Sequence, residues 1–76
     1  MKTAREMFNG LGFYRQYETV NEVCYEDDQR LIRLTFYKDL KELDYFDGLC
    51  RYGLNPKLIK AIYKQSEELG WFENDN

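Results

Sequence analysis

The side chains that could take part in chemistry are two cysteines and two groups of carboxylates. The chain of 76 residues contains no histidine, so the commonest general base and metal ligand is missing. A nucleophilic cysteine needs a basic partner, and the predicted strands place only Arg33 beside Cys24. Arginine can lower the pKa of a thiol but cannot accept its proton. Thiol catalysis is therefore not expected.

The two cysteines, Cys24 and Cys50, are far apart in the sequence and do not form a Cys-x-x-Cys pair. The opening residues 1–6 lack the apolar run of a signal peptide. Reduced thiols are therefore expected, as is usual for a cytoplasmic protein, and a Cys24–Cys50 disulfide remains the alternative. A structural zinc site is not expected from this spacing.

Carboxylates cluster at residues 26–28 and again at Glu42, Asp44 and Asp47. The first group lies at a predicted hairpin turn, where acidic residues are usually solvated. The second group alternates along a predicted strand and lacks the spacing of a calcium-binding loop. The glycines do not form a phosphate-binding loop either. We therefore predict no catalytic, cofactor or metal site, and we do not expect an enzyme.

The charged residues are unevenly distributed along the chain. The net charge is −3, and residues 67–76 carry four acidic and no basic side chains, which leaves a net charge of +1 for the rest. Lys57, Lys60 and Lys64 have helical spacing and could contact phosphate, but three lysines release few counterions. A solvated face with Lys64 paired to a nearby glutamate is the preferred interpretation. Nucleic-acid binding is therefore not expected. The sequence contains no apolar run of about eighteen residues, so a membrane span is not predicted either.

The predicted helices begin and end with clear signals. A capping box at Thr3 and the pair Asn55-Pro56 predict two helix starts. Each helical pattern ends in Leu-Gly-aromatic, at residues 11–13 and 69–71. Glycine supplies the left-handed residue that ends a helix, and the following aromatic packs on the last turn. The buried stripe of the second helix is predicted to be Leu58, Ile59, Ile62, Ser66 and Leu69, with Ala61 beside it.

Alternating apolar residues predict strands at 22–26, 30–37 and 41–46, and residues 13–19 are a candidate for a first strand. These elements predict a two-layer α+β fold in the order α-β-β-(β)-β-α. It is a three- to four-stranded antiparallel meander flanked by an N-terminal and a C-terminal helix. Residues 1–72 are expected to form a single domain, and residues 73–76 an acidic tail that frays.

The strand register can be predicted from the apolar pattern. A two-residue loop at Asp39-Leu40 would pair Phe36 with Leu43, and one at Asp28-Gln29 would pair Tyr25 with Ile32. Both hairpins then place one apolar set on a single face, and a slip by one residue would scatter it. The set is Val23, Tyr25, Ile32, Leu34, Phe36, Leu43 and Tyr45. The two helices are expected to cover this face.

Three segments of the chain resemble short proteins of phages and prophages of Gram-positive bacteria. The segments are Ala4-x-Glu6-x-Phe8-x-x-Leu11-Gly12-Phe13, Leu34-Thr35-Phe36-Tyr37-Lys38, and the stretch 58–71 that ends in Leu69-Gly70-Trp71. The resemblance spans nearly the whole chain and implies a phage-derived, cytoplasmic setting. It contains no motif of catalytic residues and therefore implies no activity.

The chain contains more aromatic residues than so small a core needs: seven Tyr, five Phe and one Trp. Overflow from the core is the simple explanation, and a partner surface is the functional one. Strand alternation directs Arg33, Tyr37 and Phe46 away from the core, and Arg and Tyr often dominate interface energetics. We therefore expect a non-enzymatic protein-interaction module that binds another protein, of host or phage, through these three residues.

Three alternatives remain open. The chain could self-associate as a homodimer through the polar sheet face or an edge strand. Its aromatic sheet could bind single-stranded nucleic acid weakly by base stacking, although the basic groove that this requires is missing. A helix or residues 13–19 could also cover the outer sheet face, which would make Phe46 a core residue.

Overall fold

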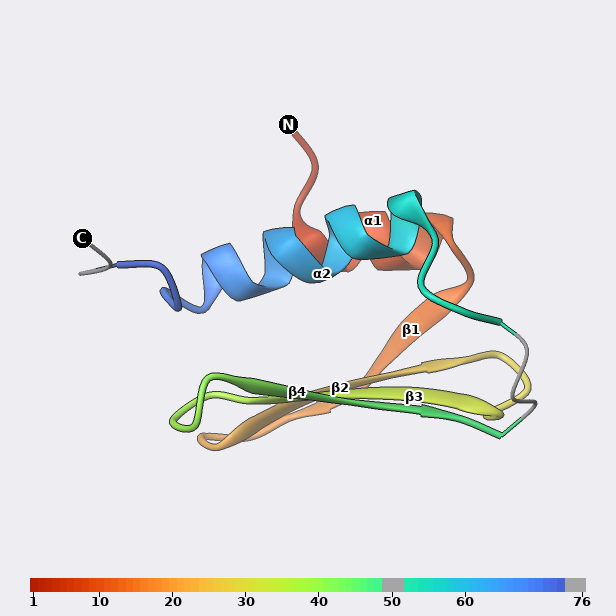
Figure 1. Ribbon diagram of the computed structural model, residues 1–76, viewed down its shortest axis with the longest axis horizontal. Helices are drawn as coiled ribbons and strands as arrows, with labels where there is room; N and C mark the ends of the chain where they lie inside the picture. The colour runs from red at the N-terminus through yellow and green to blue at the C-terminus, as the bar shows by residue number, and fades with distance from the viewer. Residues whose placement is uncertain (49–51, 74–76) are drawn as a thin grey trace.

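The computed structural model describes residues 1–48 and 52–73 and contains two helices and four strands. In chain order they are α1 (Ala4–Gly10), β1 (Phe13–Glu18), β2 (Glu22–Asp27), β3 (Ile32–Tyr37), β4 (Glu42–Asp47) and α2 (Pro56–Glu68). The strands form one antiparallel sheet in the order β1-β2-β3-β4, and both helices lie on the same face of it (Figure 1). The predicted α+β class is confirmed, and the candidate first strand is β1.

Two sequence predictions fall on residues outside the described part of the chain. Cys50 is one of them, so the Cys24–Cys50 disulfide stays a prediction. The acidic tail at 73–76 is the other, because only its first residue is described. The N–H of Glu73 donates to the carbonyl of Gly70 at 3.2 Å, and that residue still belongs to the turn after α2.

Both helices begin and end as their sequences predict. The Thr3 hydroxyl accepts the N–H of Glu6 while the Glu6 carboxylate accepts the N–H of Thr3, and the Asn55 side chain accepts the N–H of Leu58. Gly12 and Gly70 have φ values of 87° and 78°, the left-handed conformation that ends a helix without steric cost. The Leu-Gly-aromatic triplets are therefore helix stops.

The register between β3 and β4 matches the prediction, and the register between β2 and β3 does not. Phe36 pairs with Leu43 as expected. Tyr25, however, pairs with Leu34 and not with Ile32, so the β2–β3 pairing is displaced by two residues. A displacement of two preserves the alternation of side chains. The predicted apolar set therefore still lies on one face.

The turn between β2 and β3 explains the displaced register. Its length is set by Asp27, whose carboxylate accepts the N–H groups of Leu31 and Ile32 at 2.8 and 3.0 Å. The carbonyl of Asp27 also accepts the N–H of Arg30, which has a left-handed φ of 59°. The turn is therefore longer than the two residues predicted, because a side-chain acceptor and a left-handed arginine stabilise it.

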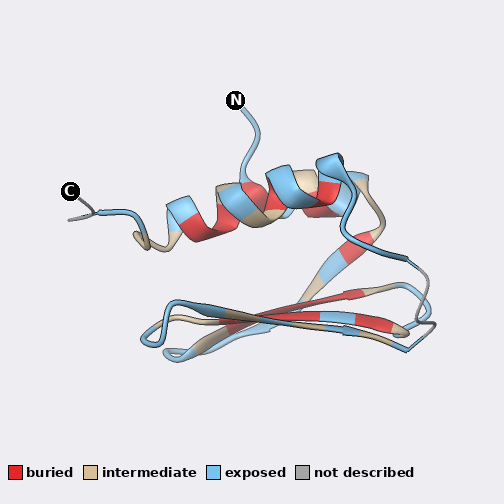
Figure 2. Cartoon of the chain, in the orientation of Figure 1, coloured by how far each residue is buried: buried red, intermediate tan, exposed pale blue. Residues whose placement is uncertain are grey.

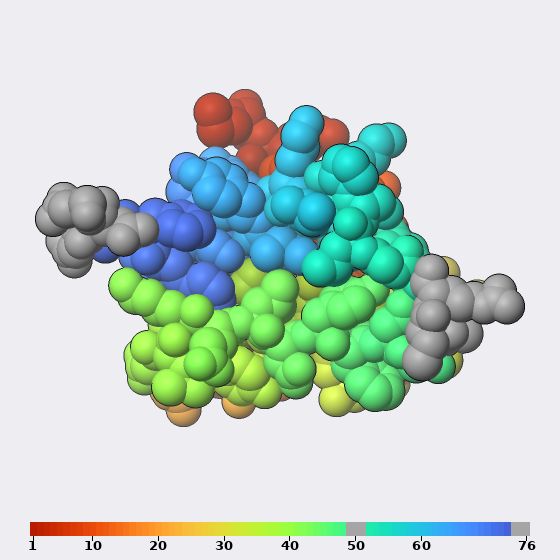
Figure 3. Space-filling view, in the orientation of Figure 1, coloured from red at the N-terminus to blue at the C-terminus, as the bar shows by residue number. Residues whose placement is uncertain are grey.

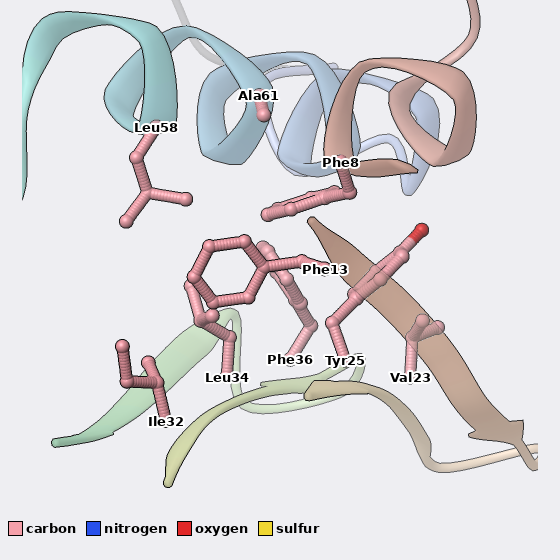
Figure 4. Close-up of a cluster of buried hydrophobic side chains, with 9 residues drawn as sticks. All are labelled: Phe8, Phe13, Val23, Tyr25, Ile32, Leu34, Phe36, Leu58 and Ala61. Carbon is pink, nitrogen blue, oxygen red and sulfur yellow. The ribbon is translucent and has the colours of Figure 1, made fainter. Parts of the chain in front are cut away.

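The core lies between the helices and the inner face of the sheet (Figure 4). It consists of Phe8, Phe13, Val23, Tyr25, Ile32, Leu34, Phe36, Leu58 and Ala61. Leu43 and Tyr45, from the edge strand β4, pack against it and are partly buried. Buried residues are concentrated on β2, on β3 and on the inner sides of the helices (Figure 2). The predicted core face is therefore confirmed.

A buried polar cluster links the two layers. The Tyr25 hydroxyl donates to the Gln65 amide oxygen at 2.6 Å and accepts from the Arg15 guanidinium at 2.8 Å. The Tyr25 ring stacks on Phe8 with 4.1 Å between ring centroids. Burial raises the pKa of Tyr25, and Arg15 opposes this rise. Tyr25 therefore contacts β1, α1 and α2 at once.

One residue of the predicted α2 stripe is misplaced. Ile59 is 49% exposed, whereas Gln65, which the prediction left out, is buried. The side of α2 that faces the sheet carries buried residues at helical spacing: Leu58, Ala61 and Gln65. Ile59 lies about 100° around the helix from Leu58. A large aliphatic side chain is consequently left on the outer side of α2.

Alanine substitutions at two glycines near the end of α1 should have opposite effects on stability. A Cβ would meet no atom within 4 Å at either Gly10 or Gly12, but only Gly12 has a positive φ. Gly12→Ala should lower the free energy of unfolding by about 1–2 kcal/mol, and Gly10→Ala should raise it by about 0.5–1 kcal/mol. Urea unfolding measures both. Equal effects would contradict the helix-stop interpretation.

Removing the Tyr25 hydroxyl should destabilise the fold. Tyr25→Phe leaves Gln65 and Arg15 with one partner fewer in a buried cluster, which should cost about 1–2 kcal/mol. Tyr63→Phe is the matched control, because Tyr63 is 56% exposed, and it should change the free energy of unfolding by less than about 0.5 kcal/mol. Thermal and urea unfolding of both variants give the comparison.

Candidate functional site

The sheet face opposite the helices, here called the outer face, is the candidate functional site. Strand alternation and the register place these residues on it: Tyr14, Tyr17, Glu22, Cys24, Glu26, Arg33, Thr35, Tyr37, Glu42, Asp44 and Phe46. Within residues 1–48 and 52–73, neither helix covers this face (Figure 1). Residues 13–18 join the sheet as β1, and Phe46 is 61% exposed, so the alternative in which a helix or residues 13–19 cover this face is wrong.

One row of side chains crosses all four strands of the outer face. Tyr14 pairs with Glu26, Glu26 with Arg33, and Arg33 with Phe46. The Arg33 Nε lies 2.8 Å from Oε2 of Glu26, so the two form a charge-assisted hydrogen bond. The Arg33 side chain nevertheless stays 59% exposed, and the register places Phe46 on the next strand. The row therefore places a paired carboxylate and guanidinium between two aromatic residues.

Three of the four aromatic residues of the outer face are well exposed, and Tyr37 is partly buried. Phe46 is 61% exposed, Tyr14 45% and Tyr17 44%. None of the three belongs to the core cluster, so their size is not needed to fill it. Large aromatic side chains held on a rigid sheet, with a polar surround, are typical of protein interfaces.

The centre of the outer face is formed by small side chains. Cys24 and Thr35 are paired on the two central strands and are 1% and 5% exposed. They are buried by larger neighbours on the same face, among them the Tyr17 side chain opposite Cys24. Burial raises the pKa of the Cys24 thiol, so little of it is ionised near neutral pH. Cys24 therefore forms part of the floor of the outer face.

The three residues predicted as a partner site are only partly brought together. Arg33 and Phe46 are direct cross-strand partners, as predicted. Tyr37 pairs with Glu42 at the other end of β3, about 13 Å from Arg33 at the usual rise of a strand. There it lines a shallow hollow of about 260 Å³ with Asn21, which lies in the turn between β1 and β2. Tyr37 therefore belongs to the edge of the site.

Three members of the site were not among the residues predicted for it. Tyr14 and Tyr17 join the outer face through β1, which the sequence supported only as a candidate strand. Glu26 is the partner of Arg33, although the predicted register placed Cys24 beside that arginine. The alternation of Tyr14 with the core residue Phe13 was the available signal for the outward direction of Tyr14.

The two layers of the molecule differ in charge. Residues 13–48, which form the sheet and its turns, hold nine acidic and five basic side chains, a net charge of −4. Residues 1–12 and 52–73, which contain the helices, hold four acidic and five basic side chains, a net charge of +1. On the outer face itself, four carboxylates accompany the single guanidinium of Arg33. The site is therefore acidic.

Two further features concern only the described residues, 1–48 and 52–73. In that part of the chain, no three carboxylate, cysteine or histidine side chains are grouped so that they could hold a metal ion. Neither of its helices combines the length and the apolar character needed to cross a membrane. The chemistry available on the outer face is thus that of aromatic, acidic and guanidinium groups.

Removing the Glu22 carboxylate should lower the pKa of Tyr17. The hydrogen bond from the Tyr17 hydroxyl to Glu22, 2.8 Å long, raises the pKa of Tyr17 to about 12. In Glu22→Ala we expect it to fall toward about 10, as followed by NMR of the tyrosine ring carbons. Glu42→Ala removes another carboxylate of the outer face and is the control. An unchanged pKa in Glu22→Ala would contradict the contact.

The same shift has a consequence for stability. The folded protein keeps a proton on Tyr17 that the unfolded chain loses near pH 10. The contribution of Tyr17 to the free energy of unfolding is therefore fully present below about pH 10. It declines as the pH rises from about 10 to about 12. The Glu22→Ala variant should show a smaller decline over this range.

No protein-family model matches this chain, and no curated protein or solved structure is significantly similar to it. The resemblance to phage and prophage proteins therefore stays a prediction. The outer face itself offers exposed aromatic residues, one guanidinium paired with Glu26, and a surplus of carboxylates.

Proposed function

We propose that this chain is a non-enzymatic protein-interaction module that binds a basic segment of another protein on its outer sheet face. The observation that carries the proposal is the row from Tyr14 to Phe46, which leaves large aromatic rings exposed on a rigid sheet. In this proposal Phe46 and Arg33 form the anchor, and Tyr14 and Tyr17 extend it across the sheet.

The charge of the outer face supports a basic partner. Glu22, Glu42 and Asp44 surround the aromatic residues, and Glu26 already neutralises Arg33. Lysine or arginine side chains of a partner could pair with these carboxylates and pack over the rings by cation–π contact. The same carboxylates would repel a phosphate backbone, which argues against single-stranded nucleic acid as the ligand.

Self-association is the second candidate, because β4 is an edge of the sheet and its outer backbone groups could pair with a second copy. Charge opposes this pairing. Glu42 and Asp44 alternate along the outer face of β4, so two copies of the strand would bring carboxylates together, and like charges opposite one another destabilise a sheet.

The biological setting is part of the same proposal. The resemblance of the two Leu-Gly-aromatic segments and the β3 segment to short phage and prophage proteins supports a phage-derived accessory protein. Such a protein would act in the cytoplasm by modulating a host or phage protein. A small domain without a catalytic set suits this role, since binding alone can modulate a partner.

Affinity capture from the native host tests this function, and Phe46→Ser is the test variant. Phe46 is 61% exposed, so the substitution should change the free energy of unfolding by less than about 0.5 kcal/mol. It should nevertheless reduce recovery of the captured protein at least about tenfold. Arg33→Ala is less clean, because it would leave the buried Glu26 without its nearest cation.

Leu54→Ser is the matched control, since Leu54 is 48% exposed and lies outside the sheet. Recovery should survive in this variant and decrease as salt is added, because the contact includes exposed charges. Loss of the captured protein in Leu54→Ser, with retention in Phe46→Ser, would place the site elsewhere. Sedimentation of the purified chain tests the alternative: a dimer that Phe46→Ser dissociates would replace the proposed function by self-association.

A further inference from the structure

A second surface lies on the helical layer, away from the sheet. The N-terminal segment and the outer side of α2 enclose an open groove of about 620 Å³. Its apolar lining comes from Met1, Met7, Ile59 and Tyr63. Figure 3 shows the N-terminal residues, in red, beside α2, in blue, with the sheet on the opposite side of the helices. The groove is therefore separate from the outer face.

The groove exists because α1 is shorter than the helix beside it. α1 has seven residues and α2 has thirteen, which gives lengths of about 10 and 20 Å. Ile59 and Tyr63 are one turn apart on α2, outside its buried stripe, and are 49% and 56% exposed. Tyr63 is further held by stacking on Phe72 at 5.2 Å. Part of α2 is thus left with an apolar ridge that no element of the described chain covers.

The rim of the groove is basic. Lys2, Lys60 and Lys64 line it together with a single acidic residue, Glu67. Glu67 lies 3.6 Å from Lys64, while neither Lys2 nor Lys60 forms an ion pair within residues 1–48 and 52–73. Two lysines therefore remain available at the rim of an apolar surface, in a chain whose net charge is −3.

We propose that this groove binds an amphipathic helix of a partner protein whose apolar stripe is flanked by acidic residues. An apolar ridge along α2 is formed by Ile59 and Tyr63, which are four residues apart. A basic ridge runs parallel to it and is formed by Lys60 and Lys64, which have the same spacing. A helix packs against such ridges with its own side chains at the same spacing. The flexible Met1 and Met7 side chains can adapt to its apolar residues, and its carboxylates would pair with the lysines.

The shape and charge of the groove distinguish this occupant from others. An open groove along a helix leaves most of a small ligand in water, whereas a helix covers the whole ridge. Three lysines supply few contacts for a nucleic-acid backbone, and the apolar lining would stay unused by it. A second copy of the chain is the remaining candidate, because its acidic outer face complements the lysines.

A synthetic peptide provides the probe. It should have about 16 residues, enough for a stable helix on binding, with leucines at i, i+3, i+4 and i+7, glutamates beside them and alanines elsewhere. Fluorescence anisotropy with the full chain should give a Kd in the range of about 10–100 µM. A peptide of the same pattern with lysine in place of glutamate should bind at least about tenfold more weakly.

Ile59→Glu and Leu54→Glu form a matched pair of variants, since both side chains are aliphatic and are 49% and 48% exposed. Ile59→Glu should raise the Kd of the glutamate peptide at least about tenfold, and Leu54→Glu should leave it within about twofold. Lys60→Glu should abolish the preference for the glutamate peptide, because the rim then carries two lysines and two glutamates. Amide NMR signals of residues 59–63 should shift on titration, and unfolding curves check that each variant folds.

Every outcome decides the proposal. The proposal is supported if Ile59→Glu weakens binding, Leu54→Glu preserves it, and Lys60→Glu removes the preference for the glutamate peptide. Absence of binding at about 1 mM protein overturns it, as does equal binding of both peptides to the unsubstituted chain or NMR shifts confined to the sheet. A concentration-dependent dimer that Ile59→Glu dissociates would also overturn it, because a second copy would then occupy the groove.

Discussion

The buried phenol of Tyr25 is the contact on which the two-layer arrangement depends. Its ring stacks on Phe8 of α1, and its hydroxyl joins Gln65 of α2 to Arg15 of β1. A buried hydroxyl must be hydrogen-bonded, so the positions of α2 and β1 are fixed by bond geometry as well as by apolar packing. One side chain of a central strand thereby aligns both helices and the neighbouring strand.

The exposure of the outer face follows from how the helices are held. Besides sharing Tyr25, they are joined directly, because the Glu68 carboxylate accepts the N–H of Ala4 at the start of α1 at 2.8 Å. A negative charge is favourable at a helix N-terminus. Two helices tied to each other and to one tyrosine cover a single face of the sheet. The other face keeps its aromatic residues in contact with solvent.

Much of the fold could be predicted because the alternation of apolar residues tolerates an error of two in register. The length of the β2–β3 turn could not be predicted, because it depends on the Asp27 carboxylate and on Arg30, which is left-handed although it is neither glycine nor asparagine. Ile59 was misplaced because several apolar residues compete for one helical stripe. For the site, alternation alone was enough to direct Arg33 and Phe46 outward. Their partners on other strands required the correct register.

The unequal charges of the two layers give the molecule an electric dipole that runs from the sheet to the helices. In the field of a charged partner, such a dipole experiences a torque, so the two molecules rotate toward complementary faces before they touch. This orientation raises the fraction of diffusional encounters that are productive, and with it the association rate constant. A basic partner and an acidic partner would approach this chain from opposite directions.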